Sequence, residues 1–335
     1  MSDSSCSGIS LMSGGLDSQL AVRVLQRAGA HVEAVTFETP FFSADAGRKA
    51  AVALGVKLHV VDFTDDEISL IENPPHGFGG AMNPCIDCHA LMIRRAGELM
   101  ARLGFDFVAT GEVQGQRPMS QNRQSLGIVE KVSGLKGRLV RPLSARLLEP
   151  TVPELEGRLD REQLLDLSGR GRERQIALAA EFGIVDYPSP AGGCKLTEEG
   201  FCRKLRDLMD HEGLGDRRLV HLLTVGRRFR LAGGTGVALG RDRIENQVLK
   251  ELDRIKSEGS VILSPVNVPG PTAFIPSLKG EADFALATEL VAAYSRYDRL
   301  EGEIVLSVRR AGAPDERVTM PRPYSREKFK ACQIC

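Results

Sequence analysis

The first thirty residues contain a short apolar run that leads through Ser-Gly-Gly-Leu-Asp-Ser directly into apolar residues at helical spacing. Such a short run is typical of a buried strand, and the two glycines allow a tight turn into the helix. Apolar runs typical of strands cover residues 9–12, 32–37, 58–63 and 105–109, and helical patterns cover 18–28, 44–54 and 88–103. This alternation with short connections predicts an α/β fold, in which a parallel sheet is covered by helices on both faces.

The loop after the first predicted strand is the place where such a sheet binds ligands, because ligands lie at the carboxyl ends of parallel strands. Ser13, Gly14 and Gly15 can turn their backbone N–H groups around an anion. Asp17 and Ser18 begin a helix whose positive end faces the same anion. The loop lacks the lysine that a phosphoryl-transfer loop uses. It therefore suits the pyrophosphate released when ATP adenylates a substrate, with Asp17 positioning Mg²⁺.

The sequence "SGGLDS" after a first strand resembles the pyrophosphate-loop ATPases, which include ATP pyrophosphatases, asparagine and GMP synthetases and tRNA thiolation enzymes. The resemblance implies an adenine nucleotide alpha hydrolase-like domain that uses ATP. It also implies that the pyrophosphate is held by Ser13, Gly14, Gly15, Leu16, Asp17 and Ser18. The structural alternative is a plain strand–turn–helix connection without a ligand.

The bulk properties are those of an ordinary two-domain protein. The 335 residues are 42% hydrophobic and 26% charged, with zero formal net charge. The start "MSDSSCSG" lacks the basic and apolar regions of a signal peptide, and no apolar run reaches the ~18 residues of a membrane span. We therefore expect a cytoplasmic protein without a membrane partner, in which the seven cysteines are reduced.

Three cysteines are candidates for sulfur chemistry or metal binding. In "AMNPCIDCHALMIRRAGELM", Asn83 is the expected N-cap and Pro84 the first helical residue. The positive helix end favours a thiolate at Cys85, and Cys88 lies on the same helix face. Cys194 follows a Pro/Gly-rich loop from which its sulfur can reach the same cleft. Two buried, inert cysteines in the helix are the alternative.

Two mechanisms are open for these three thiols. In one, a persulfide on Cys194 or Cys85 attacks an activated carbonyl and a neighbouring thiol resolves it as a disulfide. In the other, all three ligate a [4Fe–4S] cluster whose free iron position holds the attacking sulfide. We favour the cluster, by resemblance to thiolases that carry one on three cysteines.

The remaining cysteines include a second Cys-x-x-Cys, at Cys332 and Cys335. This pair can complete a zinc site with Cys85 and Cys88, act as a mobile persulfide carrier, or form an inert or redox-sensitive tail. We expect Cys6 and Cys202 to be structural.

The stretch "FVATGEVQGQRPMSQ" with "RPL" downstream resembles the pyrophosphate-loop domain of the bacterial tRNA 4-thiouridine synthetases, whereas "NPCIDC" resembles the tRNA 2-thiouridylases. These families adenylate a tRNA uridine carbonyl and replace its oxygen with sulfur. The resemblance places Gly111 beside the nucleotide and Phe37 near adenine. Gln116, Ser120 and Gln121 would line the loop after the fourth strand. It also implies tRNA as substrate and a sulfur donor, either a persulfide carrier such as a cysteine desulfurase or inorganic sulfide.

The second half is more basic than the first. Residues 203–256 hold thirteen Lys and Arg against eight Asp and Glu, whereas residues 1–75 hold five against ten. This bias indicates a polyanion-binding face, although solvated helix faces are the alternative. An α+β pattern is expected here, with strands at 228–231, 237–239, 261–263, 273–275 and 304–308 and helices at 243–256 and 282–294.

The segments "VALGRDRIENQVL" and "NVPGPTAFI" resemble the RNA-binding domain of NFACT proteins. The resemblance places Gly240, Arg241 and Asn246 with Pro269 and Gly270 on one face. Arg241 and Asn246 are then expected RNA contacts, as are Arg227 and Arg228 of the basic stretch. Because this half lacks Trp and has few Tyr, we expect it to contact phosphates and the shape of a folded RNA rather than stack on bases.

The sequence thus predicts a pyrophosphate-loop domain at residues 1–212 and an RNA-binding domain with a Cys-x-x-Cys tail at residues 213–335. The favoured function is ATP-dependent tRNA sulfur transfer. Sulfur transfer or amide formation on a small molecule, and an inactive RNA-binding adaptor, are the alternatives.

Overall fold

The computed structural model describes residues 6–117, 120–189, 193–252, 259–297 and 300–334. The chain divides into two compact units, Met1–Thr197 and Glu198–Cys335. Helix α8 (Glu199–His211) belongs to the second unit, whereas the boundary expected from the sequence is at 212/213. No helix in the described ranges is both long and apolar enough to cross a bilayer.

The first unit is built on a five-stranded parallel sheet. The strands are β1 (Ser7–Leu11), β2 (His31–Glu38), β3 (Leu58–Asp62), β4 (Phe107–Ala109) and β5 (Leu139–Val140). Their order is β3-β2-β1-β4-β5, and all neighbours pair in parallel. This confirms the predicted α/β fold and its first four strands.

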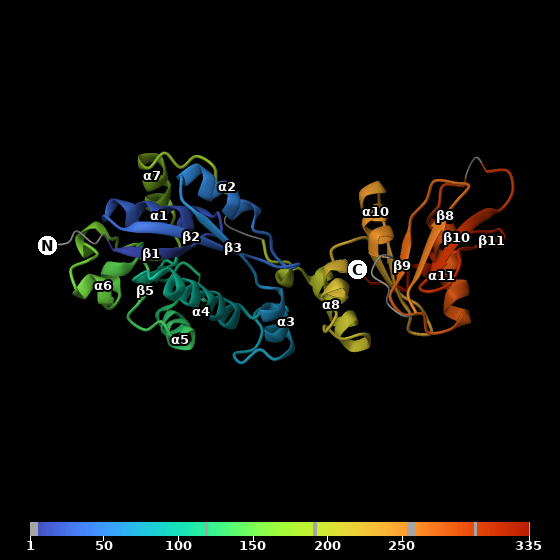
Figure 1. The fold of residues 1–335 in the computed structure, drawn as a ribbon, viewed down its shortest axis with the longest axis horizontal. Coiled ribbons are helices and arrows are strands. Elements are labelled where there is room, and N and C mark those ends of the chain that lie inside the picture. The colour runs from blue at the N-terminus through green and yellow to red at the C-terminus, as the bar shows by residue number, and fades with distance from the viewer. Residues whose placement is uncertain (1–5, 118–119, 190–192, 253–258, 298–299, 335) are drawn as a thin grey trace. The chain divides into compact units, whose positions relative to one another are not determined.

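Helices cover both faces of this sheet (Figure 1). One face carries α1 (Leu16–Arg27), α2 (Asp45–Leu54) and α7 (Glu173–Glu181), and the other carries α4 (Cys85–Leu103) and α5 (Arg123–Ser133). Helix α3 (Thr64–Glu72) packs against α4, and α6 (Val152–Leu155) is a single turn. The predicted helices correspond to α1, α2 and α4, whereas α3, α5 and α7 were not predicted.

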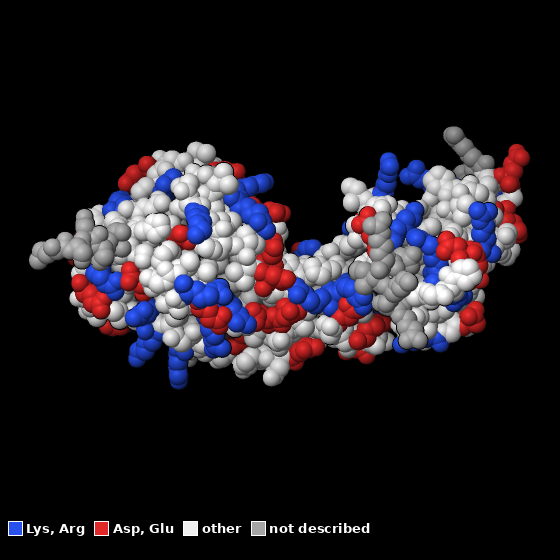
Figure 2. Space-filling view, in the orientation of Figure 1, with Lys and Arg blue, Asp and Glu red and all other residues white. Residues whose placement is uncertain are grey.

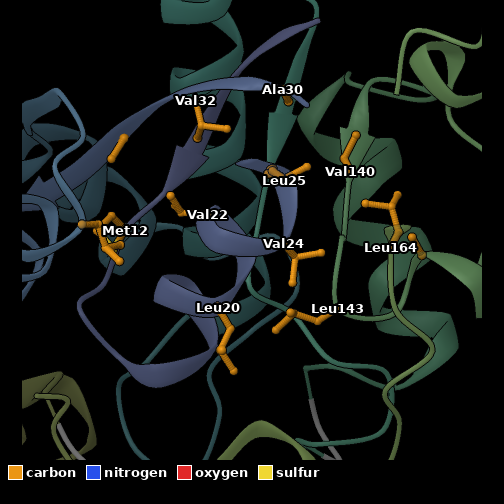
Figure 3. Packing of buried hydrophobic residues seen from close by; sticks show 14 of the residues in the cluster. Met12, Leu20, Val22, Val24, Leu25, Ala30, Val32, Val140, Leu143 and Leu164 are labelled. Carbon is orange, nitrogen blue, oxygen red and sulfur yellow. The ribbon is translucent and has the colours of Figure 1, made fainter. Parts of the chain in front are cut away.

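The apolar face of α1 fixes the start of that helix against the sheet. Leu20 and Leu25 are fully buried, and they belong to one cluster with Val32 of β2 and Val140 of β5 (Figure 3). Burying each leucine contributes about 1.5–3 kcal/mol. The loop that precedes α1 is therefore anchored at its carboxyl end by the core of the unit.

The second unit contains a seven-stranded antiparallel sheet in the order β11-β10-β8-β9-β7-β6-β12. Its strands are β6 (Arg227–Arg230), β7 (Gly236–Leu239), β8 (Val261–Pro265), β9 (Ala273–Ile275), β10 (Ile304–Arg310), β11 (Glu316–Met320) and β12 (Gln333–Ile334). Helix α11 (Glu281–Tyr294) packs on one face, and α9 (Arg217–Leu222) and α10 (Arg243–Glu251) pack on the other. This confirms the expected α+β character of the unit.

The end of the chain differs from the expectation. Strands β11 and β12 follow the strand that was predicted to be last, and β12 pairs with β6 through Ile334 and Arg228. Cys332 packs beside the core of this unit, and its carbonyl accepts a hydrogen bond from the Arg230 N–H. The segment that follows Cys332 thus forms an edge strand of this sheet, and a role of the Cys-x-x-Cys pair as a persulfide carrier stays a prediction. Cys335 and the end of the helix predicted at 243–256 lie outside the described residues.

Candidate functional site

The first sheet has a topological switch point at the carboxyl ends of β1 and β4. In the order β3-β2-β1-β4-β5, the chain moves outward from β1 in one direction and returns on its other side at β4. The loops that leave two such strands diverge and open a crevice. Here these loops contain residues 13–18 and 110–121, which are two of the motifs that the sequence indicated.

Residues 13–18, a loop up to Gly15 followed by the first turn of α1, are called the pyrophosphate loop below, and glycine holds this loop in shape. Gly14 has a φ of +81°, and a Cβ atom there would lie 2.3 Å from the backbone carbon of Ala46. The Ser18 hydroxyl donates to the Gly15 carbonyl at 2.8 Å, and the Gly15 N–H donates to the Ser13 hydroxyl at 3.3 Å. Only glycine satisfies both the conformation and the space at residue 14.

Asp17 is held by two side chains from distant parts of the chain. The Gln116 amide donates to Asp17 Oδ2 at 2.9 Å, and the Arg172 guanidinium lies 3.9 Å from the same oxygen. The Gln116 contact brings together two segments that the resemblance had placed at the nucleotide. Arg172 was not predicted as a site residue, because its stretch "SGRGRER" is typical of a solvent-exposed start of a helix.

Several buried polar atoms around the crevice have no hydrogen-bond partner in the part of the chain that the structure describes. They are Asp17 Oδ1, Gln114 Oε1, Gln116 Oε1, Gln121 Oε1 and Arg172 Nε. Burying such atoms without a partner costs about 1–3 kcal/mol each. A polar or charged ligand bound in the crevice would give these atoms hydrogen-bond partners.

Gly111 lies directly against the pyrophosphate loop. A Cβ atom at Gly111 would approach the carbonyl carbon and oxygen of Asp17 to 2.6 Å. Phe37, by contrast, is buried and packs edge-to-face on Phe63, with ring centroids 5.3 Å apart. Phe37 thus lies in the core at the end of β2, and its predicted place near adenine stays a prediction.

Glu112 connects this crevice with helix α4. Arg141 donates to its carboxylate at 2.8 Å, and Nε2 of His89 lies 3.1 Å from its other oxygen. Burial alone would raise the pKa of Glu112, but His89 and Arg141 hold it well below its usual value. His89 directly follows Cys88, so side-chain contacts connect Glu112 at the crevice with the turn of α4 that carries the cysteines.

The amino-terminal end of α4 corrects the capping prediction. The helix begins at Cys85 with Pro84 as the N-cap residue, so Asn83 is not the N-cap. Instead, the Asn83 amide accepts from the Ala81 N–H at 3.1 Å and donates to Cys85 Sγ at 3.0 Å. Cys85 is exposed at the positive end of the helix, with a hydrogen-bond donor on its sulfur.

Cys88 has a different environment. It is half-buried and lies close to the buried Glu67 of α3. Burial raises the pKa of this thiol well above its usual value, and the charges of Glu67, Cys194 and Cys85 raise it further. Burial also raises the pKa of Glu67 to about 7. No sequence pattern had indicated Glu67.

The segment that carries Cys194 is fixed by backbone hydrogen bonds to two neighbouring loops. The Lys195 N–H donates to the Phe41 carbonyl at 2.9 Å, and the Met82 N–H donates to the Leu196 carbonyl at 3.2 Å. These bonds place Cys194 between the loop after β2 and the loop before Cys85. The three cysteines therefore share one neighbourhood, as their mutual effect on Cys88 also indicates.

The three thiols are not arranged as a ready metal site. Within the described ranges, no three or more His, Cys, Asp and Glu side chains come together in a way that could hold a metal ion. Cys6 and Cys202 are buried, at 2% and 1% exposure, which agrees with a structural role.

The RNA contacts expected in the second unit are only partly accessible. Arg241 is exposed, but Glu245 binds its guanidinium; Asn246 bridges the Thr272 N–H at 2.8 Å and the Gly270 carbonyl at 3.3 Å. Arg227 is half-buried, with its guanidinium 5.5 Å from the Tyr294 ring centroid.

Arg228 requires a correction. It is 1% exposed, and its three guanidinium nitrogens are buried without a hydrogen-bond partner in the described structure. Its side chain therefore does not lie on a surface that RNA can contact. On the face shown in Figure 2, basic and acidic side chains are interspersed over both units rather than gathered in one basic patch.

Comparison with known protein families identifies both units. Residues 3–146 match the family model "Thiamine biosynthesis protein (ThiI)", and residues 226–331 match "NFACT protein RNA binding domain". The chain therefore carries a ThiI-type domain followed by an NFACT-type RNA-binding domain, which confirms both resemblances.

Individual relatives match parts of the chain. A "Probable tRNA sulfurtransferase" of Caldanaerobacter subterraneus subsp. tengcongensis is 32% identical over 142 residues, which are 40% of this chain and 35% of the relative. A "tRNA-specific 2-thiouridylase MnmA" of Roseiflexus sp. is 27% identical over 67% of this chain and 70% of the relative. The chain spans about a third of the length of the first curated relatives that it matches.

A solved structure described as "Crystal structure of a 4-thiouridine synthetase - RNA complex with bound ATP" is 22% identical, with a TM-score of 0.37. The match covers 64% of this chain and 52% of that chain.

Proposed function

We propose that this chain is an ATP-dependent tRNA sulfurtransferase, which adenylates a uridine carbonyl of tRNA and replaces its oxygen with sulfur. The observation that carries the proposal is the pairing of a glycine-shaped anion loop with three cysteines in one compact unit. Relatives named tRNA sulfurtransferase and tRNA-specific 2-thiouridylase, and the RNA-binding family of the second unit, support tRNA as the substrate.

In the adenylation step, the uridine carbonyl oxygen attacks the α-phosphorus of ATP and pyrophosphate leaves. The backbone N–H groups of the pyrophosphate loop and the N-terminus of α1 bind the leaving pyrophosphate. The Arg172 guanidinium lies 3.9 Å from Asp17 Oδ2, so its positive charge offsets negative charge beside the bound pyrophosphate. The free Oδ1 of Asp17 fits Mg²⁺, which is usually bound in proteins by one or two carboxylates together with substrate phosphates.

In the sulfur-transfer step, the terminal sulfur of a persulfide on Cys85 or Cys194 attacks the adenylated carbon, and the bond to AMP breaks. The second thiol then attacks the cysteine sulfur, which breaks the S–S bond and frees the thiouridine as a disulfide forms. A dithiol reductant restores the two thiols. Cys88 is a poor nucleophile, because thiolates carry this chemistry and burial raises the pKa of its thiol.

The [4Fe–4S] cluster expected from the sequence does not fit the arrangement of side chains as it stands. Cluster ligation needs thiolates directed at a common group, whereas burial raises the pKa of the Cys88 thiol and no such group of ligands is formed in the described structure. We keep the cluster on Cys85, Cys88 and Cys194 as the alternative sulfur-holding proposal. About four irons per chain after anaerobic purification, lost in any single Cys→Ala variant, would establish it. A colourless protein that is active with a persulfide donor would exclude it.

The function is tested by incubating the protein with ATP, Mg²⁺, unmodified bulk tRNA and either sodium sulfide or a cysteine desulfurase with cysteine. We expect tRNA-dependent pyrophosphate release together with a thiolated nucleoside detected by mass spectrometry. Pyrophosphate release that needs a small molecule instead of tRNA would support the small-molecule alternative. Binding of tRNA with no pyrophosphate release under any condition would support an inactive adaptor.

A further inference from the structure

Phe78 is the one Phe or Tyr side chain that is exposed in the part of the chain that the structure describes. It is 42% exposed, on the segment "NPPHGFGGAMNP" that joins α3 to α4. A single exposed apolar side chain is ordinary on a protein surface, so it is the position of this ring, and not its exposure alone, that points to a role.

The segment around Phe78 is tied on both sides to the start of α4. Before Phe78, the His76 N–H donates to the buried Asp87 carboxylate at 2.9 Å, and His76 Nδ1 lies 2.6 Å from its other oxygen. After Phe78, the Gly79 N–H donates to the Asn83 carbonyl at 2.9 Å. Asn83 also donates to Cys85 Sγ. The ring therefore lies between two hydrogen-bonded attachments, to Asp87 and to Asn83, at the start of α4.

The residues that flank Phe78 are glycines for identifiable reasons. Gly77 has a φ of +74°, which other residues rarely adopt. A Cβ atom at Gly79 would lie 2.5 Å from the Asn83 amide nitrogen. The local backbone thus presents the ring between glycines, on a segment that Asn83 connects by hydrogen bonds to Cys85 Sγ.

A base that is to react with ATP and a thiol must first leave its stack in the RNA. Unstacking a nucleotide costs a few kcal/mol, and enzymes that act on bases compensate by stacking the base on an aromatic side chain. A single exposed ring matches the area of one flat base. A protein partner would need a larger apolar patch, of the kind found at interface cores.

Resting on the proposed function, we propose that Phe78 is the stacking surface for the extruded nucleobase that undergoes thiolation. The sequence indicated that the second unit lacks a stacking platform, and this ring in the first unit supplies one. In this proposal the first unit binds the base, and the second unit binds the phosphates of the RNA.

The chain contains no tryptophan, so Phe78→Trp introduces a single fluorophore at the site. Stacking against a base quenches indole fluorescence. We expect unmodified tRNA, with no ATP and no sulfur donor present, to quench this variant by at least half. The matched control is Leu155→Trp in the same unit, at a side chain that is 72% exposed, and its fluorescence should change little. Because this readout needs no turnover, it remains decisive even if the thiolation reaction itself fails.

A second measurement separates stacking from a role in folding. Phe78→Tyr should retain thiolation, whereas Phe78→Ala should raise KM for tRNA at least about fivefold, since base–aromatic stacking contributes about 1–3 kcal/mol. Pyrophosphate release driven by a high tRNA concentration should fall much less. Equal quenching at positions 78 and 155, or quenching of the Phe78→Trp variant by a cysteine desulfurase and not by tRNA, would overturn the proposal. Unchanged KM in Phe78→Ala would do the same.

Discussion

The candidate site has a nucleotide half, formed by the pyrophosphate loop, and a sulfur half, formed by the three cysteines and Glu67. The two halves are built in opposite ways. The pyrophosphate loop is one continuous stretch whose backbone is fixed by Gly14, by α1 and by the buried core beneath it. The sulfur half gathers side chains from α3, from α4 and from the segment before α8, and its thiols differ in exposure. In the proposed mechanism, anion binding therefore depends on backbone shape, whereas sulfur chemistry depends on the environment of individual side chains.

The largest expected effect is at Asp17. Asp17→Ala should lower tRNA-dependent pyrophosphate release at least a hundredfold, because positioned charge supplies much of the rate of such transfers. Asp45→Ala is the matched control, since Asp45 is also an acidic residue in a first helical turn. Normal release in Asp17→Ala, or an equal loss in Asp45→Ala, would remove Asp17 from the mechanism.

The stability that the sulfur half contributes should depend on pH. Because burial raises the pKa of Glu67 to about 7, Glu67 favours the folded state at low pH and this contribution is lost as the pH rises through about 7. Glu67→Gln removes the ionisation, so its stability relative to the parent should increase by about 2 kcal/mol between pH 5 and pH 8. Urea unfolding at both pH values measures this difference. A constant difference would show that Glu67 is ionised throughout.

The shape of the pyrophosphate loop can be tested at Gly14. Gly14→Ala forces a side chain into positive φ and against Ala46, so ATP affinity should fall about tenfold. Gly127→Ala is the control, because a Cβ atom at that helical position meets nothing within 4 Å. Isothermal titration with ATP compares the two variants. Equal affinities would show that the loop tolerates another backbone shape.

The smallest effect is expected at Arg241. Glu245 already neutralises its guanidinium, so Arg241→Ala should weaken tRNA binding only two- to threefold and lower the salt dependence by about one counterion. Arg317→Ala, on strand β11 at the far end of the sheet order from β6, should change neither quantity. Identical binding curves for the parent and Arg241→Ala would exclude this residue from the interface.

The two halves of the site also differed in how far the sequence could predict them. The pyrophosphate loop was predictable because its glycines, Asp17 and the flanking strand and helix lie within one short stretch. Gly111 and Gln116 were found through their motif, and the structure places both against Asp17.

The environment of the cysteines was not predictable in the same way. Glu67 and Arg172 come close to the site only through the packing of α3 and α7, which no local pattern indicates. The burial of Arg228 illustrates the same limit. A basic stretch shows that arginine is present, but the alternation of a strand decides which arginine points inward.

The central claim is that the uridine carbonyl oxygen becomes bonded to the α-phosphorus of ATP before sulfur replaces it. Transcribed tRNA with ¹⁸O at the uridine carbonyls tests this most directly, when it is incubated with the protein, ATP and a sulfur donor. The account predicts that each thiouridine formed is matched by one AMP that carries ¹⁸O, as measured by mass spectrometry. Thiolation that yields unlabelled AMP, or label recovered only in water, would contradict it.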